Sequence, residues 1–291
     1  MEDEVNFLNV VFLALVHACA VVAVWYLWQV RFSWATVALA LSWFFACGIS
    51  VTGGYHRLFS HRSYACMPAL EVCYLFFGAS ALQNSAMKWS ADHRRHHAYT
   101  DKDNDPYNIK RGFWWAHIGW VFFKNPPCDK ASVPDLAQNP RVALQHRYYF
   151  PIAIVAFLFP VAIAALWGDA WGGLLVAGFL RLATQYHSTF CVNSVAHWIG
   201  KQPYTLADSS RDSFVTALVT LGEGYHNYHH RFPWDYRNGV RWYQFDPTKW
   251  WVAVCAKMHM ATSVRRVSKL DIMKAWAEVR AIQRTFTERV S

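Results

Sequence analysis

Histidine residues gather in three short clusters along the chain, and their spacing is the first chemical signal in the sequence. On a helix, residues at i, i+3 and i+4 share one face, so each HxxHH cluster directs three imidazoles toward one point. The i, i+5 pair of the first cluster requires a helix end that turns both rings toward one centre. The clusters are HRLFSH, HRRHH and HNYHH, and their histidines are His56, His61, His93, His96, His97, His226, His229 and His230.

Imidazoles without thiolates are ligands that suit iron, zinc, copper or nickel. The seven cysteines are scattered and form no CxxC motif, so neither a disulfide framework nor a Cys-ligated metal is indicated. Eight histidines exceed the needs of one ion, and we therefore predict two. A redox-active pair beside apolar spans indicates oxygen chemistry on a lipid. Histidines outside the clusters are interpreted as ordinary hydrogen-bonded residues: His17, His117, His146, His187 and His259.

The composition places these histidines in a membrane protein. Of 291 residues, 54% are hydrophobic and 17% aromatic, and only 16% are charged, against about 25% in a soluble domain. Disorder, collagen and coiled coil are excluded. The net charge of +9, together with the apolar runs, favours an anionic membrane face or an acidic protein partner over nucleic acid.

Four transmembrane helices are predicted, near 7–29, 33–54, 148–167 and 171–192, because each range is almost uncharged and long enough to span. Two very short links make them two hairpins. Of the 28 Lys and Arg residues, only Arg31 and Arg181 lie outside the termini and the segments 56–147 and 201–291. The positive-inside rule then places both segments and the N-terminus in the cytoplasm. We predict an all-α membrane protein with a single domain, 1–291, and a cytosolic helical cap from 56–147 and 193–291 that holds the di-metal site.

Shorter patterns predict elements at the membrane surface. The apolar stretches 72–87 and 213–222 are expected as interfacial helices, and the aromatic stretches 113–123 and 242–252 fit the headgroup level. Residues 262–291 show helical spacing and are predicted as a surface helix. Arg181 lies at mid-membrane depth, where a charge is a candidate functional residue. We favour the alternative interpretation, that it is a charge paired inside the bundle.

Longer motifs around the clusters carry a family resemblance. The stretches GISVTGGYHRLFSHRSY, ALQNSAMKWSADHRRHHAYTDKDNDPYNIKRGFWWAHIGW, FCVNSVAHWIG and GEGYHNYHHRFPWDYRNGVRWYQFDPTKWW resemble the membrane fatty-acid desaturases, in particular the group with the stearoyl-CoA (Δ9) desaturases. The resemblance implies four transmembrane helices under a cytosolic cap and a di-iron centre, although an overexpressed protein can load zinc instead. It adds His197 as a ninth ligand and Asn193 as a residue that holds a metal-bound water. These two are four apart, so one helical face is expected to present both.

The same resemblance implies a reaction and a substrate site. The reaction is O2-dependent insertion of a cis double bond, at Δ9, into a saturated acyl chain, and it uses two external electrons. Gln83, Trp89 and Thr189 match residues that line the bend of the acyl tunnel, Asn84 and Asp92 match headgroup contacts, and Lys124 matches a phosphate contact. Trp89 as an interface aromatic and Lys124 as a positive-inside lysine are the alternatives.

Two departures from the family pattern bear on the acyl carrier. Animal acyl-CoA members carry a basic residue where Ala91 stands, and two adjacent basic residues where this chain has Phe123 and Lys124. Acyl-CoA is the expected substrate, and a glycerolipid-linked or carrier-protein-linked acyl chain is the alternative.

The electrons must come from a separate protein, because the chain shows no dinucleotide fingerprint and no HPGG haem motif. Cytochrome b5, ferredoxin and rubredoxin are the candidate donors. The bacterial inner membrane is favoured over the endoplasmic reticulum. A histidine-rich membrane hydroxylase is a competing function. A metal transporter or sensor is disfavoured, because it would need ionisable residues in several spans.

Overall fold

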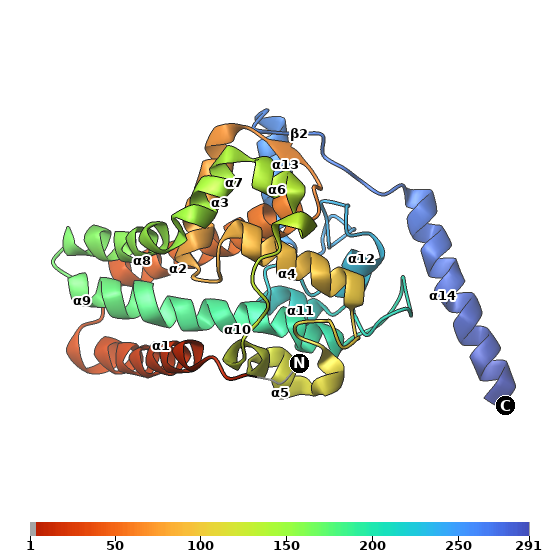
Figure 1. The fold of residues 1–291 in the computed structure, drawn as a ribbon, viewed down its shortest axis with the longest axis horizontal. Helices are drawn as coiled ribbons and strands as arrows, with labels where there is room; N and C mark the ends of the chain where they lie inside the picture. The colour runs from red at the N-terminus through yellow and green to blue at the C-terminus, as the bar shows by residue number, and fades with distance from the viewer. Residues whose placement is uncertain (1–3, 291) are drawn as a thin grey trace. The chain divides into compact units, whose positions relative to one another are not determined.

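Helices make up most of the structure, a computed structural model that describes residues 4–290 (Figure 1). The α-helices are α1 (Phe7–Trp25), α2 (Trp34–Ile49), α3 (Pro68–Ser80), α4 (Ala86–Tyr99), α5 (Phe113–His117), α6 (Pro134–Gln138), α7 (Pro140–Arg147), α8 (Tyr149–Ala165), α9 (Ala170–Gly172), α10 (Arg181–Asn193), α11 (Phe214–Val219), α12 (His226–Arg231), α13 (Pro247–Lys257) and α14 (Lys269–Val290). The π-helices are η1 (Tyr26–Val30), η2 (Ser50–Ser60) and η6 (Gly173–Leu180). The 3₁₀ turns are η3 (Ile109–Arg111), η4 (Gly119–Phe122), η5 (Lys130–Ser132) and η7 (Val195–His197).

The contacts divide the chain into two compact units. Unit 1 consists of Met1–Ser60, Pro68–His93 and Ile118–Ser188, and unit 2 consists of His61–Met67, Arg94–His117 and Thr189–Ser291. Unit 2 also contains the short strands β1 (Ala65–Cys66) and β2 (Ala261–Thr262), which pair antiparallel and which the sequence did not predict.

Two continuous helices within residues 4–290 are long and apolar enough to cross a membrane, Phe7–Val30 and Trp34–Ser60. They correspond to the first two predicted spans and make the chain an integral membrane protein. The third predicted span corresponds to α8, which reaches the required length only together with α7, across a bend of 84°. The fourth is formed by α9, η6 and α10. The polar residues of α10, such as Gln185 and His187, lower its hydropathy, and this span stays a prediction.

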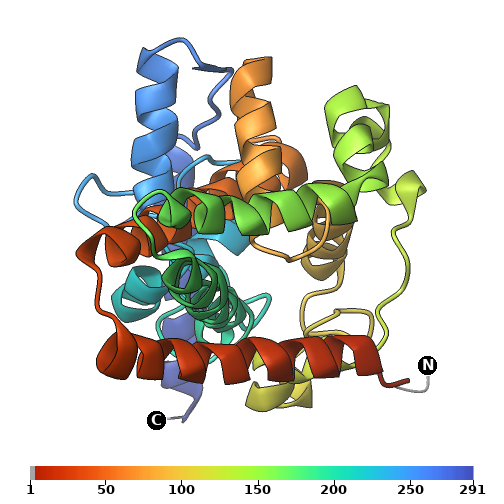
Figure 2. The same cartoon turned by 90° about the vertical axis from the view of Figure 1, so that its left-hand side faces the viewer.

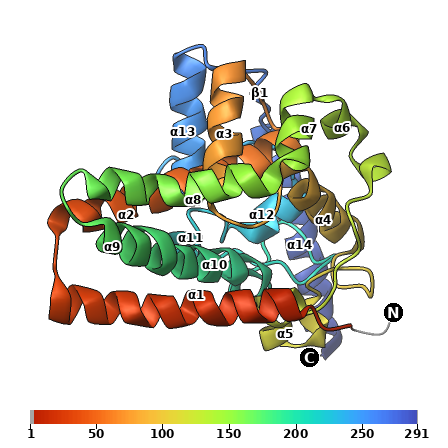
Figure 3. The same cartoon turned by 60° about the vertical axis from the view of Figure 1, so that its left-hand side comes forward.

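Small residues let the helices of unit 1 approach closely. Figures 2 and 3 show the run from α9 through η6 to α10 lying between α1 and α8. A Cβ atom added to Gly173 in η6 would lie 2.7 Å from the Cβ of Ala164 in α8, so only glycine fits there. Close approach of this kind, rather than a hydrophobic driving force, holds helices together in lipid.

A buried aspartate joins the two short interhelical links of unit 1. The Asp169 carboxylate is only 2% exposed and accepts hydrogen bonds from the Tyr26 hydroxyl at 2.6 Å and from the Thr36 hydroxyl. Arg31 adds a hydrogen bond to the carbonyl of Gly168 at 2.7 Å. The links that follow η1 and α8 are therefore fixed to each other.

The structure refines the predicted surface elements. The apolar stretch 72–87 is not one helix, because α3 ends at Ser80 and α4 begins at Ala86. The helix expected from residue 262 begins only at Lys269, where Ser268 caps it by accepting from the backbone N–H of Asp271 at 3.1 Å. Residue 291 of that prediction lies outside the described residues.

Cysteine labelling tests the topology within unit 1. We predict that a membrane-impermeant maleimide added to intact cells labels Ala170→Cys, beside the second short link. It should label Lys130→Cys, on the predicted cytosolic side, only after lysis. Both native residues are exposed, so access to the side chain does not bias the comparison. The background carries Cys73→Ser and Cys128→Ser, and the reverse labelling pattern would invert the topology.

Candidate metal centre

Four histidines of unit 2 form a group, called here the four-histidine group: His96, His197, His226 and His230. One ligand nitrogen from each lies within 4.8 Å of the others. The Nε2 atoms of His96 and His230 are 3.4 Å apart, and those of His230 and His226 are 3.1 Å apart. Nitrogens bound to one tetrahedral ion at about 2.0–2.1 Å lie roughly 3.3–3.4 Å from each other. The spacing of the four rings therefore fits a single metal ion.

Hydrogen bonds on the outer side of the rings orient three of these four imidazoles. The Nδ1 of His96 donates to Asp105 at 2.9 Å, and the Nδ1 of His230 donates to Asp208 at 3.2 Å. The Nδ1 of His197 bonds to the hydroxyl of Ser209 at 2.8 Å. With each Nδ1 engaged, Nε2 is the nitrogen that carries the lone pair, and in His96 and His230 it faces the other rings of the group. Outer-shell partners of this kind fix the tautomer of metal-ligating histidines.

One ring nitrogen in the four-histidine group provides a direct test of fit. The Nε2 of His197 is buried and makes no hydrogen bond within residues 4–290. The Nδ1 of His226 also has no partner in the described chain, but it is not the nitrogen that faces His230. A buried nitrogen without a partner is costly unless a metal, ion or water satisfies it. The residues present therefore fit a metal ion.

Burial keeps these rings in the form that binds metal. Desolvation, reinforced by the nearby His96, lowers the pKa of His197 to about 3. Desolvation and the neighbouring rings, His230 first, hold the pKa of His226 well below its usual value. Both rings are neutral at physiological pH, and neutral imidazole is the ligand form.

Three further histidines of unit 2, called here the three-histidine group, converge next to the first four: His61, His97 and His229. The Nε2 atoms of His97 and His229 are 3.0 Å apart, and the ring centroids of His61 and His97 are 4.6 Å apart. The rings of His97 and His230 stack at 4.5 Å, so the two groups are neighbours. In unit 1, His56 and His93 form a pair with ring centroids 4.6 Å apart.

Helix α12 is held in place by residues that the sequence analysis did not single out. Asn227 is fully buried, and its side chain bonds to the backbone of Tyr204 at 2.8 Å and of Ser210 at 3.0 Å. Asp212 accepts from the backbone N–H groups of Asn227 and Tyr228, at 2.8 and 3.0 Å. Burial nevertheless raises the pKa of Asp212 to about 7. These bonds fix the helix that carries three of the predicted ligands.

One local expectation about the ligands is wrong. Asn193 and His197 do not lie on a continuous α-helical face, because α10 ends at Asn193 and His197 belongs to the 3₁₀ turn η7. Ser194, between them, is buried: its hydroxyl accepts from the Nδ1 of His117 at 2.9 Å and donates to the carbonyl of Phe190 at 2.8 Å.

The predicted substrate residues of unit 1 differ in their surroundings. The Trp89 ring stacks on His93 at 5.0 Å and lies 6.2 Å from His56, so it contacts the histidine pair. Asp92 is an ion-pair partner of Lys88 at 2.6 Å. Lys124 bonds to Glu4 at 2.5 Å while its side chain remains 56% exposed. Thr189 belongs to unit 2, on α10 one turn before Asn193.

The loop between α3 and α4 holds the other two predicted substrate residues, Gln83 and Asn84. Asn84 is exposed and has a left-handed backbone, with φ of 74°. Gln83 is half-buried.

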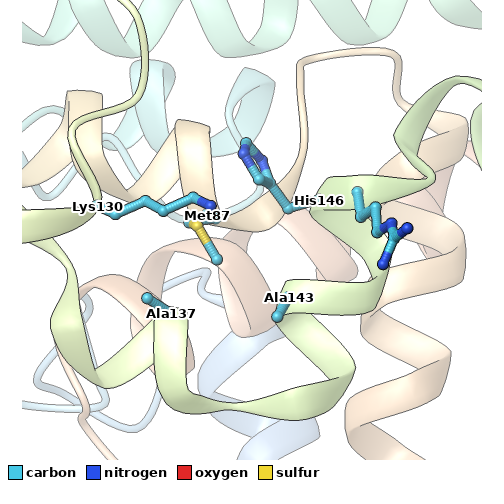
Figure 4. A pocket seen from close by; sticks show the side chains of 6 residues that line it. Met87, Lys130, Ala137, Ala143 and His146 are labelled. Atoms are coloured by element: carbon cyan, nitrogen blue, oxygen red, sulfur yellow. The ribbon is translucent and has the colours of Figure 1, made fainter.

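A pocket of about 380 Å³ in unit 1, called here the cationic pocket, combines basic and apolar side chains (Figure 4). Figure 4 shows Lys130 extending toward Met87, and His146 on the same helix as Ala143. The Nδ1 of His146 lies 2.7 Å from the Ser85 hydroxyl. The lining residues are Met87, Lys130, Ala137, Ala143, His146 and Arg147.

Apolar spanning helices and two adjacent histidine groups, of which the four-histidine group is backed by carboxylates, define a class of histidine-rich membrane proteins suited to bind metal. The comparisons specify the family. The fatty acid desaturase family model matches residues 32–265, so the chain belongs to the fatty acid desaturase family.

Three relatives agree with this assignment. The chain is 43% identical to a probable acyl-CoA desaturase of Schizosaccharomyces pombe, over 94% of this chain and 58% of that protein. It is 43% identical to acyl-CoA desaturase 1 of Saccharomyces cerevisiae, over 78% of this chain and 46% of that protein. It is 35% identical to the sn-2 palmitoyl-lipid 9-desaturase of Nostoc, over 90% of this chain and 91% of that protein. The chain thus spans only about half the length of the two yeast relatives.

The orienting carboxylates generate a prediction about metal affinity. We expect Asp105→Asn to weaken metal binding by about 10- to 100-fold, the usual effect of removing a carboxylate behind a ligating histidine. Metal retained through dialysis against a chelator, measured by elemental analysis, checks this. Asp103→Asn is the matched control, because Asp103 is exposed in the same loop. Equal metal retention by both variants would contradict the role of Asp105.

Proposed function

We propose that the chain is an O2-dependent fatty acyl desaturase with a di-iron centre. The observation that carries the proposal is the pair of neighbouring histidine groups in unit 2, each with ring nitrogens converging on one point. In the proposal, the four-histidine group holds one iron. The three-histidine group, completed by His56 and His93, holds the other.

Local backbone geometry supports the inclusion of His56 and His93. His93 and His97 are four apart on α4, and residues at this spacing share a helical face. His56 lies in the π-helix η2, which ends at Ser60, directly before His61. Hydrogen bonds in a π-helix run from i to i+5, so its wider turn stacks residues five apart, whereas an α-helix rotates them by about 140°.

The iron centre would supply O2 activation and removal of two hydrogens from adjacent methylenes, which no side chain can perform. The protein residues orient the ligands and position the acyl chain. Trp89 is suited to the latter task because its ring packs against His93 and His56 and belongs to two apolar clusters. A chain that lies along this ring is kept beside the histidine pair, in an environment that excludes water.

We further propose acyl-CoA as the substrate, a cis double bond at Δ9 as the product, and a separate electron donor protein on the cytosolic side. Each buried methylene contributes roughly 0.8 kcal/mol to binding wherever it lies in an apolar tunnel. Apolar burial alone therefore does not choose the position of the double bond, and polar contacts at the headgroup must fix the register.

Expression in a desaturase-deficient host tests the activity. We expect wild type to produce cis-monounsaturated fatty acids and the purified protein to hold about two irons, whereas His96→Ala should abolish the product because a lost ligand impairs metal affinity and tuning. His187→Gln is the control, since this exposed histidine lies outside both groups. Gas chromatography with mass spectrometry identifies the products. Hydroxylated products would instead favour a membrane hydroxylase, and normal desaturation by His96→Ala would remove His96 from the ligand set.

The cationic pocket leads to a prediction about the acyl carrier. We propose that Lys130, which lines this pocket, contacts a phosphate of acyl-CoA. Lys130→Ala should then weaken acyl-CoA binding by about tenfold, the order of one charge-assisted hydrogen bond. Binding to the wild type should also depend strongly on salt concentration. Lys274→Ala on α14 removes one exposed charge elsewhere and should change nothing. Affinities are measured by equilibrium binding across salt concentrations.

Absence of both the Lys130 effect and the salt effect would favour a lipid-linked acyl chain, the substrate named for the Nostoc relative. Ala91, where animal enzymes carry a basic residue, is an unsuitable position for this test. It is 8% exposed within the core cluster that contains Tyr55 and Met87, so an arginine there would disturb packing.

A further inference from the structure

The segment between α3 and α4, residues 81–85, is a helix break inside the apolar part of unit 1. Ser80 before it and Ala86 after it are fully buried, as is Ala81, its first residue. Leu82 and Asn84 both have left-handed backbones, with φ of 52° and 74°. Carbonyl groups at such a break have lost their helical partners, and in an apolar bundle they must find others.

Helix α10 supplies two of these partners. The Nη1 of Arg181 donates to the carbonyl of Ser80 at 3.0 Å, and the hydroxyl of Tyr186 donates to the carbonyl of Leu82 at 3.0 Å. The two carbonyls lie on either side of Ala81 and directly precede Gln83. The backbone that presents Gln83 and Asn84 is therefore fixed by two side chains from one helix.

Arg181 is not the paired charge that the sequence predicts. It is 3% exposed, and no carboxylate within residues 4–290 forms an ion pair with it. Its Nε donates to the carbonyl of Ala177 at 3.1 Å, which pins the guanidinium, while its Nη2 makes no hydrogen bond in the described chain. A buried cation without a counter-ion is expensive, so an arginine whose bonds go to backbone carbonyls contributes orientation more than stability.

Other contacts hold the start of α4 against the same region. The Gln145 side chain accepts from the backbone N–H of Ala86 at 2.9 Å and donates to the carbonyl of Leu75 at 3.0 Å. These bonds fix the two helix ends but do not reach residues 82–84.

Two further side chains reach the break itself: the Ser85 hydroxyl lies 2.7 Å from the Nδ1 of His146, and Tyr149 hydrogen-bonds to the backbone of Asn84. Arg181 and Tyr186 differ from these in that they bind the carbonyl groups of Ser80 and Leu82, where the helix is interrupted.

We propose that Arg181 and Tyr186 are positioning residues that determine which acyl chain lengths and which methylene position the protein selects, by fixing the break at 81–85. The proposal rests on the proposed function and on the prediction from the family resemblance that Gln83 lines the acyl tunnel and Asn84 contacts the headgroup. Because both act on backbone carbonyls, they would control the register of the acyl chain without contacting it.

Tyr186→Phe tests this proposal because it removes one hydroxyl and keeps the ring. Relative binding of stearoyl-CoA over myristoyl-CoA should fall by about three- to tenfold, the factor that one buried hydrogen bond is worth. In the active protein, double bonds should also appear at positions next to the wild-type one. Arg181→Met should have a larger effect, and Arg181→Lys should restore part of the selectivity, because the Lys ammonium retains a donor for the Ser80 carbonyl.

Tyr26→Phe is the matched control, since it also removes one buried hydroxyl hydrogen bond, to Asp169 at 2.6 Å, at the link between the hairpins. It should lower thermal stability as Tyr186→Phe does, yet leave chain-length selectivity and double-bond position unchanged. If Arg181→Met does not accumulate as folded protein, the selectivity of Tyr186→Phe alone tests the proposal.

Unchanged selectivity in Tyr186→Phe would overturn the proposal, as would equal losses in Tyr186→Phe and Tyr26→Phe. Binding selectivity is measured without turnover, so a failure of this proposal can be distinguished from a failure of the proposed desaturase function. A wild type that binds acyl-CoA without desaturating it refutes the proposed function, while its binding selectivity still tests the role of Tyr186.

Discussion

The metal centre depends on the requirement that neutral imidazoles point ring nitrogens at one another in a low-dielectric interior. Without a metal this arrangement is unfavourable, because lone pairs face each other and the Nε2 of His197 is buried with no hydrogen-bond partner in the described chain. It is maintained by acceptors behind the rings: Asp105 behind His96, Asp208 behind His230 and Ser209 behind His197. Ser209 itself donates to Asp101 at 2.6 Å, so a carboxylate also stands at the end of that third chain of contacts.

A second constraint comes from the backbone in an apolar medium. Regular α-helix satisfies its own polar groups, but it places side chains only at its own period. The chain departs from the α-helix in the three π-helices and at the break at 81–85. Each departure leaves carbonyls that side chains or i+5 bonds must satisfy. In η2 the departure carries His56, and at the break it carries Gln83 and Asn84, so two of these irregular segments carry predicted functional residues. π-Helical segments are frequent at functional sites for this reason.

Sequence patterns predicted those features that depend on residue type and period. Long uncharged runs located the first two spans, and HRRHH and HNYHH identified five of the histidines that gather in unit 2. The expectation that each cluster directs its three rings toward one point is wrong, because the neighbours His96 and His97 belong to different groups, as do His229 and His230. The π-helical winding of η2 has no comparable signature, because it changes the hydrogen-bond partner without changing residue types. The break after Ser80 was missed because an uncharged run resembles one helix whether or not it is interrupted. Asp105 was detectable in principle, since TDKDNDP follows the second cluster, but spacing alone does not show which acidic residue turns inward.

Arg181 shows how the two constraints meet. A hydrophobic residue at that position would be better suited to the bundle, and a charge there is acceptable only where its donors are used. Its donors go to the carbonyls of Ser80 and Ala177 rather than to a carboxylate. A carboxylate would neutralise the guanidinium but would also compete with those carbonyls for its N–H groups. Because no carboxylate within residues 4–290 forms an ion pair with Arg181, its Nη1 remains available to the Ser80 carbonyl, and the cost of burying the charge is accompanied by a defined backbone conformation before Gln83.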